Sequence, residues 1–173
     1  MEKVLIFIAN LTIMKWIKLT AFSTILLGIL ATFNSCEKAA EAKKTVLYEK
    51  KGITMSGAQV VPTSASNALG TIDVFYIKGT KTLSYTINWA GLSGAPIGMG
   101  VYGTAPAGFA LPPTTPLQTI STTGLTANGS KSGTLLVDGV VVKEEAVLSG
   151  LYYIAIRTAA YPAGEIRAQV VFQ

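Results

Sequence analysis

The chain has 173 residues and 18.1 kDa, with a formal charge of +5, no histidine and one cysteine. The missing histidine excludes Ser-His-Asp and Cys-His catalysis and metal centres with His ligands. The single cysteine excludes an intramolecular disulfide and a Cys-rich metal knuckle. Charged residues make up 13% of the chain, about half the ~25% typical of globular proteins, which argues against a helical bundle linked by salt bridges. The 17 glycines and 7 prolines favour turns and strands.

The first 35 residues have the layout of an export signal. A short basic segment at residues 14–18 precedes an apolar run at 19–30, and small and polar residues follow up to Cys36. The apolar run is shorter than the ~20 residues of a membrane-spanning helix. We therefore predict a signal helix within residues 1–35, with Met14 as an alternative start of translation.

The residues before Cys36 resemble the lipobox of bacterial lipoproteins, in which the cysteine thiol receives a diacylglycerol and becomes the first residue. Ser35 fits the small residue expected there, whereas Phe33 departs from the usual Leu. The resemblance implies membrane lipid as a partner through Cys36 and a location in the cell envelope. The outer membrane or cell surface is favoured over the inner membrane, because Glu37 stands where an Asp would favour inner-membrane retention. A buried free cysteine or an uncleaved signal anchor is the alternative.

Residues 36–45 are charged and rich in alanine, and they are too few and too polar to bury a surface. They are predicted to tether the lipid to a single domain at residues 46–173. The alternative is the first turn of a domain helix.

From residue 45 onward, apolar residues alternate with polar ones, which predicts β-strands. The clearest strand is 81–90, which pairs with 71–78 through a turn at residues 79–80. A second hairpin joins 151–157 to 165–172. Further strands are predicted at residues 45–55, 97–102, 116–121 and 132–137.

The segment after residue 135 allows two interpretations. Asp138-Gly139 is typical of a two-residue hairpin turn, but residues 143–148 could form a short helix; we favour a strand, a turn and one or two helical turns. The predicted fold class is therefore all-β, a single antiparallel β-sandwich of about 7–9 strands, immunoglobulin-like or superoxide-dismutase-like, with at most one short helix.

Four phrases, in order along the chain, resemble the CHRD domain, a module first described in chordin and also found in bacterial exported proteins. They are Met-Ser-Gly-Ala-Gln-Val-Val-Pro at 55–62, Ala-Leu-Gly-Thr at 68–71, residues 82–86 with 91–94, and residues 150–153 with 158–169. The resemblance covers residues 46–173 and implies a β-sandwich. The family commonly has His-x-His-Gly where this chain has residues 100–103, and His where it has Arg157. Because Gly, Tyr and Arg replace these histidines, a metal site like that of the copper/zinc superoxide dismutases cannot form here.

Residues 98–103 match the dinucleotide fingerprint G-x-G-x-x-G, which requires a following helix to hold the pyrophosphate. Prolines at 106, 112 and 113 exclude a helix there. The glycines are therefore interpreted as positions of close strand packing. Glu144 and Glu145 are adjacent and point in different directions, so they cannot act as a paired acid and base.

Five residues are candidates for ligand contact or for fixing the register of the last hairpin: Tyr102, Arg157, Tyr161, Glu165 and Arg167. Glu165 and Arg167 are two residues apart on a strand, with Arg157 on its partner, which predicts a cross-strand ion pair. An arginine cluster that grips a carboxylate or sulfate is the functional alternative. Of the tyrosines 102, 152, 153 and 161, which could form an aromatic patch, only Tyr161 is expected to be exposed.

No catalytic residue, metal ligand or cofactor site is predicted. Eleven basic and eight acidic residues follow Cys36. This small excess of positive charge does not indicate a nucleic-acid-binding groove. The leading hypothesis is a membrane-anchored extracytoplasmic lipoprotein whose CHRD-type module binds an envelope protein or glycan, or has a structural role, without catalysis. The alternative is an enzyme, a metal-dependent relative of the superoxide-dismutase-like sandwiches with its site at residues 97–108.

Overall fold

The computed structural model describes residues 47–172. The predicted signal helix and the tether, including Cys36, lie outside the described residues. Within the described part, no helix has the length and apolar character needed to cross a bilayer.

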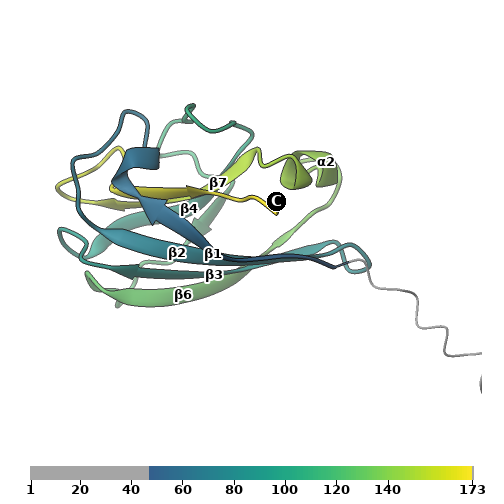
Figure 1. Ribbon diagram of the computed structural model, residues 1–173, viewed down its shortest axis with the longest axis horizontal. Coiled ribbons are helices and arrows are strands. Elements are labelled where there is room, and N and C mark those ends of the chain that lie inside the picture. Colours follow the sequence, from purple (N-terminus) through teal and green to yellow (C-terminus); the bar gives the residue numbers. More distant parts are fainter. Residues whose placement is uncertain (1–46, 173) are drawn as a thin grey trace, which may run out of the picture. The chain divides into compact units, whose positions relative to one another are not determined.

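Eight antiparallel strands form the domain, with one α-helix and one 3-10 turn among the described residues (Figure 1). The strands are β1 (Leu47–Ser56), β2 (Leu69–Ile77), β3 (Thr82–Ala90), β4 (Pro96–Gly103), β5 (Gln118–Ile120), β6 (Gly129–Leu136), β7 (Tyr152–Thr158) and β8 (Ile166–Gln169). The 3-10 turn is η2 (Gly57–Gln59) and the helix is α2 (Glu144–Leu148). The predicted all-β class, the strand number and the single short helix are confirmed.

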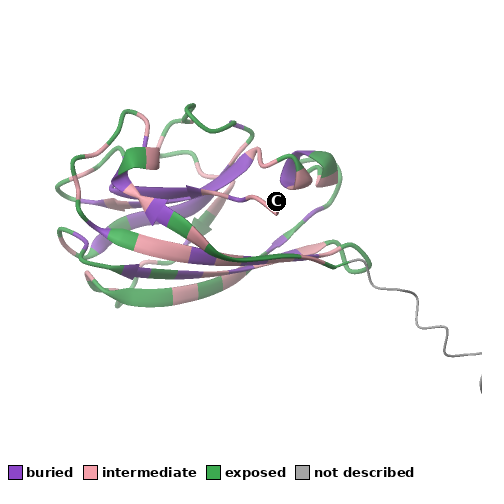
Figure 2. Cartoon of the chain, viewed as in Figure 1, coloured by how far each residue is buried: buried purple, intermediate pink, exposed green. Residues whose placement is uncertain are grey.

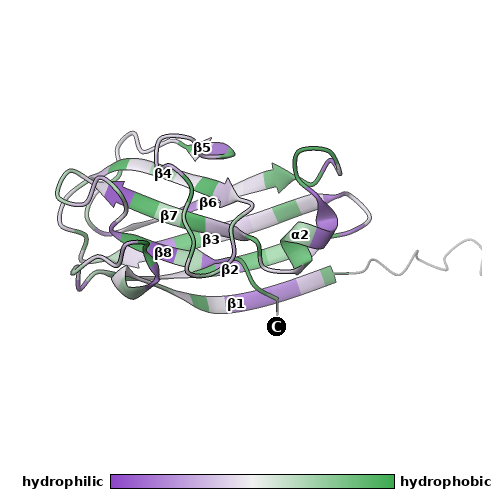
Figure 3. Ribbon diagram, turned by 90° about the horizontal axis from the view of Figure 1, so that it is seen from above, coloured by the Kyte–Doolittle hydropathy of each residue, from purple (hydrophilic) through white to green (hydrophobic). Residues whose placement is uncertain are grey.

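The strands follow the order β5-β4-β7-β8-β1-β2-β3-β6 in one sheet that is nearly closed. The first four form an upper layer in Figure 1, which Figure 3 shows from above, and the last four form a lower layer. The layers join at β8 and β1, where a single residue pair, Ser56 with Arg167, continues the ladder. The fold is thus a sandwich whose layers share one continuous sheet.

The opposite edges of this sheet, β5 and β6, are linked by side chains rather than by a ladder. Gln118 on β5 donates to the carbonyl of Thr134 on β6 at 2.8 Å. The hydroxyl of Tyr85, on β3, donates to the same amide's oxygen at 3.0 Å. One glutamine therefore bridges the seam where two edge strands would otherwise present unpaired groups.

The core lies between the layers, and the period-two pattern accounts for it. Ile72, Val74 and Tyr76 of β2 are fully buried. On β3 the predicted face is confirmed, because its four apolar residues, Leu83, Tyr85, Ile87 and Trp89, are all at most 4% exposed. In Figure 2 buried residues follow the strands, while the connecting loops are mostly intermediate or exposed.

The segment after β6 is a turn followed by α2, so the favoured interpretation of residues 138–148 is confirmed. One carboxylate oxygen of Asp138 accepts the backbone N–H groups of Val140, Val141 and Val142, each at 2.9 Å. These valines have strand propensity, but their amides are committed to the aspartate and cannot enter a ladder. The Asp-Gly hairpin therefore does not form.

Two strands are shorter than predicted. Strand β5 spans three residues rather than 116–121, and Pro116, which lacks an N–H, cannot extend its ladder. Strand β8 ends at Gln169 rather than at 172. Strand β6 begins earlier than predicted, at Gly129, where a side chain would collide with the ring of Trp89.

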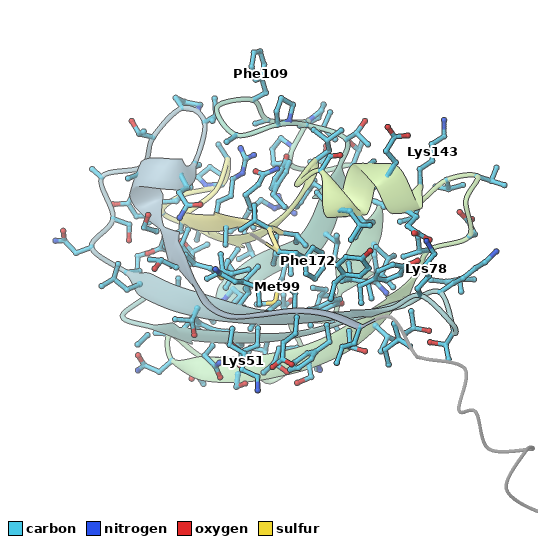
Figure 4. The ribbon with its side chains drawn as sticks, turned by 45° about the vertical axis from the view of Figure 1, so that its right-hand side comes forward. Lys51, Lys78, Met99, Phe109, Lys143 and Phe172 are labelled. Atoms are coloured by element: carbon cyan, nitrogen blue, oxygen red, sulfur yellow. The ribbon has the colours of Figure 1, made fainter. Side chains whose placement is uncertain are left out.

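The strands define two ends of the domain. The proximal end holds the start of β1, the β2–β3 turn at 78–81 and residues 137–151. The distal end holds the connections 57–68, 91–95, 121–128 and 159–164. Residues 104–117 leave β4 at the proximal end and cross the outer face of the upper layer, where Phe109 projects (Figure 4).

Candidate functional site

Most of the predicted site residues lie on the outer face of the upper layer, beneath residues 104–117. The β4–β7 register places Gly98 opposite Arg157 and Tyr102 opposite Tyr153. The β7–β8 register places Ala155 opposite Arg167. Because alternate residues share a face, two arginines and two tyrosines gather on one small area of sheet.

Tyr102 and Tyr153 form the floor of a second small core under the covering loop. Their rings stack with centroids 5.0 Å apart and planes 9° apart, and both residues are at most 3% exposed. The Tyr102 hydroxyl donates to the carbonyl of Pro113 at 2.8 Å, and the amide of Leu111 donates to the Tyr153 hydroxyl at 2.9 Å. Burial raises the pKa of Tyr102. Both hydroxyls thus fasten the loop, and these tyrosines are not a surface aromatic patch.

Arg167 fastens the same loop and is 2% exposed. Its guanidinium lies 3.7 Å from the centroid of the Tyr153 ring, a cation–π distance. Its Nη1 donates to the carbonyl of Phe109 at 2.6 Å, and its Nη2 donates to the Oε1 of Gln169 at 2.8 Å. The guanidinium group of Arg167 therefore makes its hydrogen bonds to backbone and side-chain oxygens of the domain itself.

Gln169 completes this set of contacts. Its amide nitrogen donates to the carbonyls of Ala105 and Gly150, at 2.8 and 2.6 Å. It therefore links the covering loop to the segment that leads into β7. A cavity of about 20 Å³ remains between the loop and the sheet, beside Tyr153 and Arg167. This is room for about one water molecule.

Arg157 differs from Arg167 because it is half-buried and contacts solvent. Its guanidinium occupies the space over Gly98, where any side chain would collide with it. Its Nε is buried without a hydrogen-bond partner. The charge of Arg157 opposes the effect of burial on the pKa of Tyr102. Of the two predicted arginines, only Arg157 has access to a ligand in solvent.

Glu165 connects three segments at the distal end. It is fully buried, and its carboxylate accepts four hydrogen bonds. The donors are the Ser66 hydroxyl (2.8 Å), the Ser93 amide (2.7 Å), the Ser93 hydroxyl (2.8 Å) and the Thr158 hydroxyl, while Ser64 donates to the Glu165 carbonyl at 2.7 Å. A buried charge without a cation is tolerable only when its oxygens are satisfied in this way.

The protonation of Glu165 follows from the same contacts. Burial acts to raise the pKa of the carboxyl group, but the hydrogen bonds from Thr158, Ser93 and Ser66 outweigh it and hold the pKa below its usual value. The group is therefore ionised at neutral pH. A carboxylate with four donors and no access to solvent serves structure and cannot exchange protons with a substrate.

The expected cross-strand ion pair between Glu165 and Arg167 does not form, so that prediction is wrong. Glu165 precedes β8 and bonds to serine and threonine, whereas Arg167 bonds to carbonyl oxygens, and neither joins an ion pair among residues 47–172. Neutral donors and acceptors at the correct distances satisfy each charge separately. Tyr161 is half-buried within the turn after β7, where its carbonyl accepts the amides of Thr158 and Gly164.

The glycine pattern at 98–103 is structural, as interpreted from the sequence. No helix follows it, and residues 104–117 form the covering loop. Added side chains would collide with Pro116 at Gly100 and with Tyr152 at Gly103. The glycines therefore allow neighbouring groups to pack closely on β4.

Glu144 and Glu145 start α2 and diverge as expected. Glu144 accepts a hydrogen bond from the Tyr76 hydroxyl at 2.9 Å and pairs with Lys78 at 2.8 Å, whereas Glu145 is exposed. Burial, followed by the bond to Glu144, raises the pKa of Tyr76 to about 12. Glu144 thus attaches the helix to β2.

Sequence reasoning missed the residues that complete these contacts. Ser64, Ser66 and Ser93 are ordinary loop residues in the sequence, and only the fold brings them to Glu165. Gln169 is the exception, because it lies in the same family-like phrase as Glu165 and Arg167. Its place two residues after Arg167 on one strand could have assigned it to the same face.

An open depression of about 380 Å³ lies on the outside of the lower layer, near the distal end. Leu69, which is 59% exposed, contributes apolar surface, and Thr71 and Asn88 contribute uncharged polar groups. No charged side chain lines it. Its chemistry suits a neutral ligand.

The described residues contain no cluster of three or more His, Cys, Asp or Glu side chains that could hold a metal. Comparison with known proteins identifies one family: the family model described as CHRD domain matches residues 52–170. No curated protein and no solved structure matches the chain significantly.

Proposed function

Since this chain belongs to the CHRD family, whose domain suggests a binding or structural module, we propose that it is a lipoprotein anchored in the cell envelope through Cys36. Its CHRD domain acts there outside the cytoplasm without catalysis. The single cysteine of the chain ends a signal-like segment, six residues after its apolar run, and stands eleven residues before β1 begins. This one observation carries the proposal, because diacylation of that thiol would leave the domain whole on a short tether.

The chemistry of the domain supports a non-catalytic role. Its buried carboxylate, Glu165, is saturated with donors, and Arg167 is committed to carbonyl oxygens. A catalytic acid or base needs a proton within reach of substrate, and neither group meets that need.

We place the ligand among envelope proteins and glycans rather than nucleic acids. The chain carries no charged residue between Lys81 and Lys131. The distal connections carry none either, and the carboxylate of Glu165 behind them is buried. Phosphate recognition depends on Lys and Arg, whereas hydroxyl, amide and apolar groups suit a neutral partner.

The anchor is tested by metabolic labelling with palmitate in a bacterial host with a lipoprotein pathway. Wild type is expected to incorporate label and to fractionate with membranes. The Cys36→Ala variant is expected to lose both, because no thiol remains to be acylated. Cys36→Ser is the matched control for the size of the side chain and should behave like Cys36→Ala. Label that persists in either variant would contradict the proposal.

A further inference from the structure

The proximal end displays apolar side chains that the fold leaves uncovered. Among the described residues, seven large hydrophobic side chains are at least half exposed, and four of them are at this end. They are Leu47 (50%), Leu136 (63%), Val140 (77%) and Val141 (63%).

The two valines form the tip of this surface. They are adjacent, and Asp138 holds both of their amides at 2.9 Å. The amide of Gly139 also donates to the carbonyl of Val142 at 2.9 Å, which closes the turn. Val142 itself is buried in the core. The tip is therefore fixed by hydrogen bonds and displays its valines without a conformational change.

Leu47 and Leu136 lie at the two ends of one row of the lower layer, and the tip follows Leu136 along the chain. The pairings Leu47 with Ile77, Ile77 with Thr82, and Thr82 with Leu136 join four strands in register. At about 4.8 Å per strand, the row is about 14 Å long. The amide of Val137 donates to the carbonyl of Lys81 at 2.8 Å, which holds the tip segment beside this row.

The charges of the turn at 78–81 and of residues 137–151 balance, with three basic and three acidic side chains. The carboxylate of Asp138 caps the turn, and Glu144 pairs with Lys78, while Lys81, Lys143 and Glu145 form no ion pair among the described residues. Figure 4 shows Lys78 and Lys143 on the same side as α2. Without an excess of either sign, attraction to this surface must come from its apolar groups.

The chain itself points to what covers this surface. Strand β1 begins here at Leu47, eleven residues after Cys36. A fully extended chain covers at most ~3.6 Å per residue, so a lipid on Cys36 would keep Leu47 within about 40 Å of its membrane. A domain confined so closely meets the bilayer at a high effective concentration, and weak apolar contacts are then sufficient.

We propose that the proximal end lies against the bilayer, with Val140 and Val141 inserted among the lipid headgroups. The inference rests on the proposed anchor at Cys36 and adds the orientation of the domain. The distal connections then point away from the membrane, toward a partner. The contact depends on apolar burial, so neutral lipid suffices.

The test uses the full mature protein, lipidated at Cys36 and reconstituted in phosphatidylcholine vesicles. Acylation blocks the native thiol, so an introduced cysteine is the unique site for an environment-sensitive fluorophore. Val140→Cys probes the tip, and Ala160→Cys, also exposed but at the distal end, is the matched control. Trp89 emission checks that each variant is folded.

We expect the fluorescence emission of the label at position 140 to shift to shorter wavelength. Nitroxide lipids should quench this label at least roughly twofold more than the label at position 160, because interfacial apolar groups lie ~5–10 Å below the membrane surface. Equal quenching at both positions in protein that floats with the vesicles would overturn this orientation and leave the anchor intact. Protein that does not float would overturn the anchor itself. A blue shift in detergent that grows with protein concentration would instead show that a second copy covers the tip.

Discussion

At the scale of single residues, Glu165 holds three segments of the distal end together. Its carboxylate joins the connection before β2, the connection after β3 and the end of β7 through Ser66, Ser93 and Thr158. In Glu165→Gln, an amide nitrogen replaces one of the two carboxylate oxygens and faces the hydroxyl or amide donors that this oxygen accepted. About one or two buried polar groups are then left without a hydrogen-bond partner. We expect a loss of about 2–3 kcal/mol in the free energy of unfolding, measured by urea denaturation. Glu145→Gln, at an exposed position, is the control and should change stability by less than about 0.5 kcal/mol. An equal effect of both changes would contradict this role of Glu165.

The lowered pKa of Glu165 also predicts a pH dependence. A carboxyl group whose pKa is lower in the folded than in the unfolded state stabilises the fold above its unfolded value, near 4.5. That contribution is lost as pH falls below about 4.5 and through the folded pKa. We expect the free energy of unfolding of wild type to fall more steeply over this range than that of Glu165→Gln. Urea titrations at neutral pH and at about pH 3 measure the difference, and parallel curves would contradict it.

The sequence identified Glu165 and Arg167 as important but mispaired them. Two residues of opposite charge, two apart beside a strand, predict an ion pair when only spacing is known. Two of the actual partners of Glu165, Ser93 and Ser66, lie 72 and 99 residues away. Serine and threonine hydroxyls carry no pattern that distinguishes them from those in other loops, so this set of contacts could not be read from the sequence.

At the scale of elements, residues 104–117 depend on Arg167 for their position. The guanidinium both stacks on Tyr153 and donates to the Phe109 carbonyl. Lysine keeps the charge but loses the planar fork. We expect Arg167→Lys to speed hydrogen exchange of the loop amides about tenfold, with little change in the core strands. Arg157→Lys is the matched control on the same face, because the loop stays bonded to Arg167. Unchanged hydrogen exchange of the loop amides in Arg167→Lys would show that the contacts of Tyr102 and Gln169 are sufficient to hold the loop in place.

Element prediction succeeded where local chemistry decides the outcome. The alternation in β2 and β3 and the turn between them were predicted closely, because a two-residue period with one buried face has one satisfactory register. The edge strands were predicted less well: β5 is held by only three residue pairs. Its position also depends on the contacts of Gln118 with Tyr85 and Thr134 across the seam. No sequence period encodes a bridge of this kind.

At the scale of the whole molecule, two layers share one core although their ladder is joined at a single pair. Ile72 and Val74 come from the lower layer, and Met99, Ile154 and Ile156 come from the upper layer, yet all five belong to one buried cluster. Separating the layers would expose both inner faces to water at a cost of about 1.5–3 kcal/mol for each large side chain. Neither layer can therefore persist without the other.

This shared core predicts a single cooperative unfolding transition. The chain has two tryptophans, Trp16 in the predicted signal and Trp89 in the core, so residues 47–172 carry one tryptophan probe. Trp89 is 4% exposed, and its indole nitrogen donates to the Thr126 carbonyl at 3.0 Å. Its emission reports the lower layer, whereas far-ultraviolet circular dichroism reports both. We expect the two signals to change with the same midpoint in urea, as two-state unfolding requires. Separate midpoints would mean that the pair between Ser56 and Arg167 divides two independently folding layers, and that the common core does not govern stability.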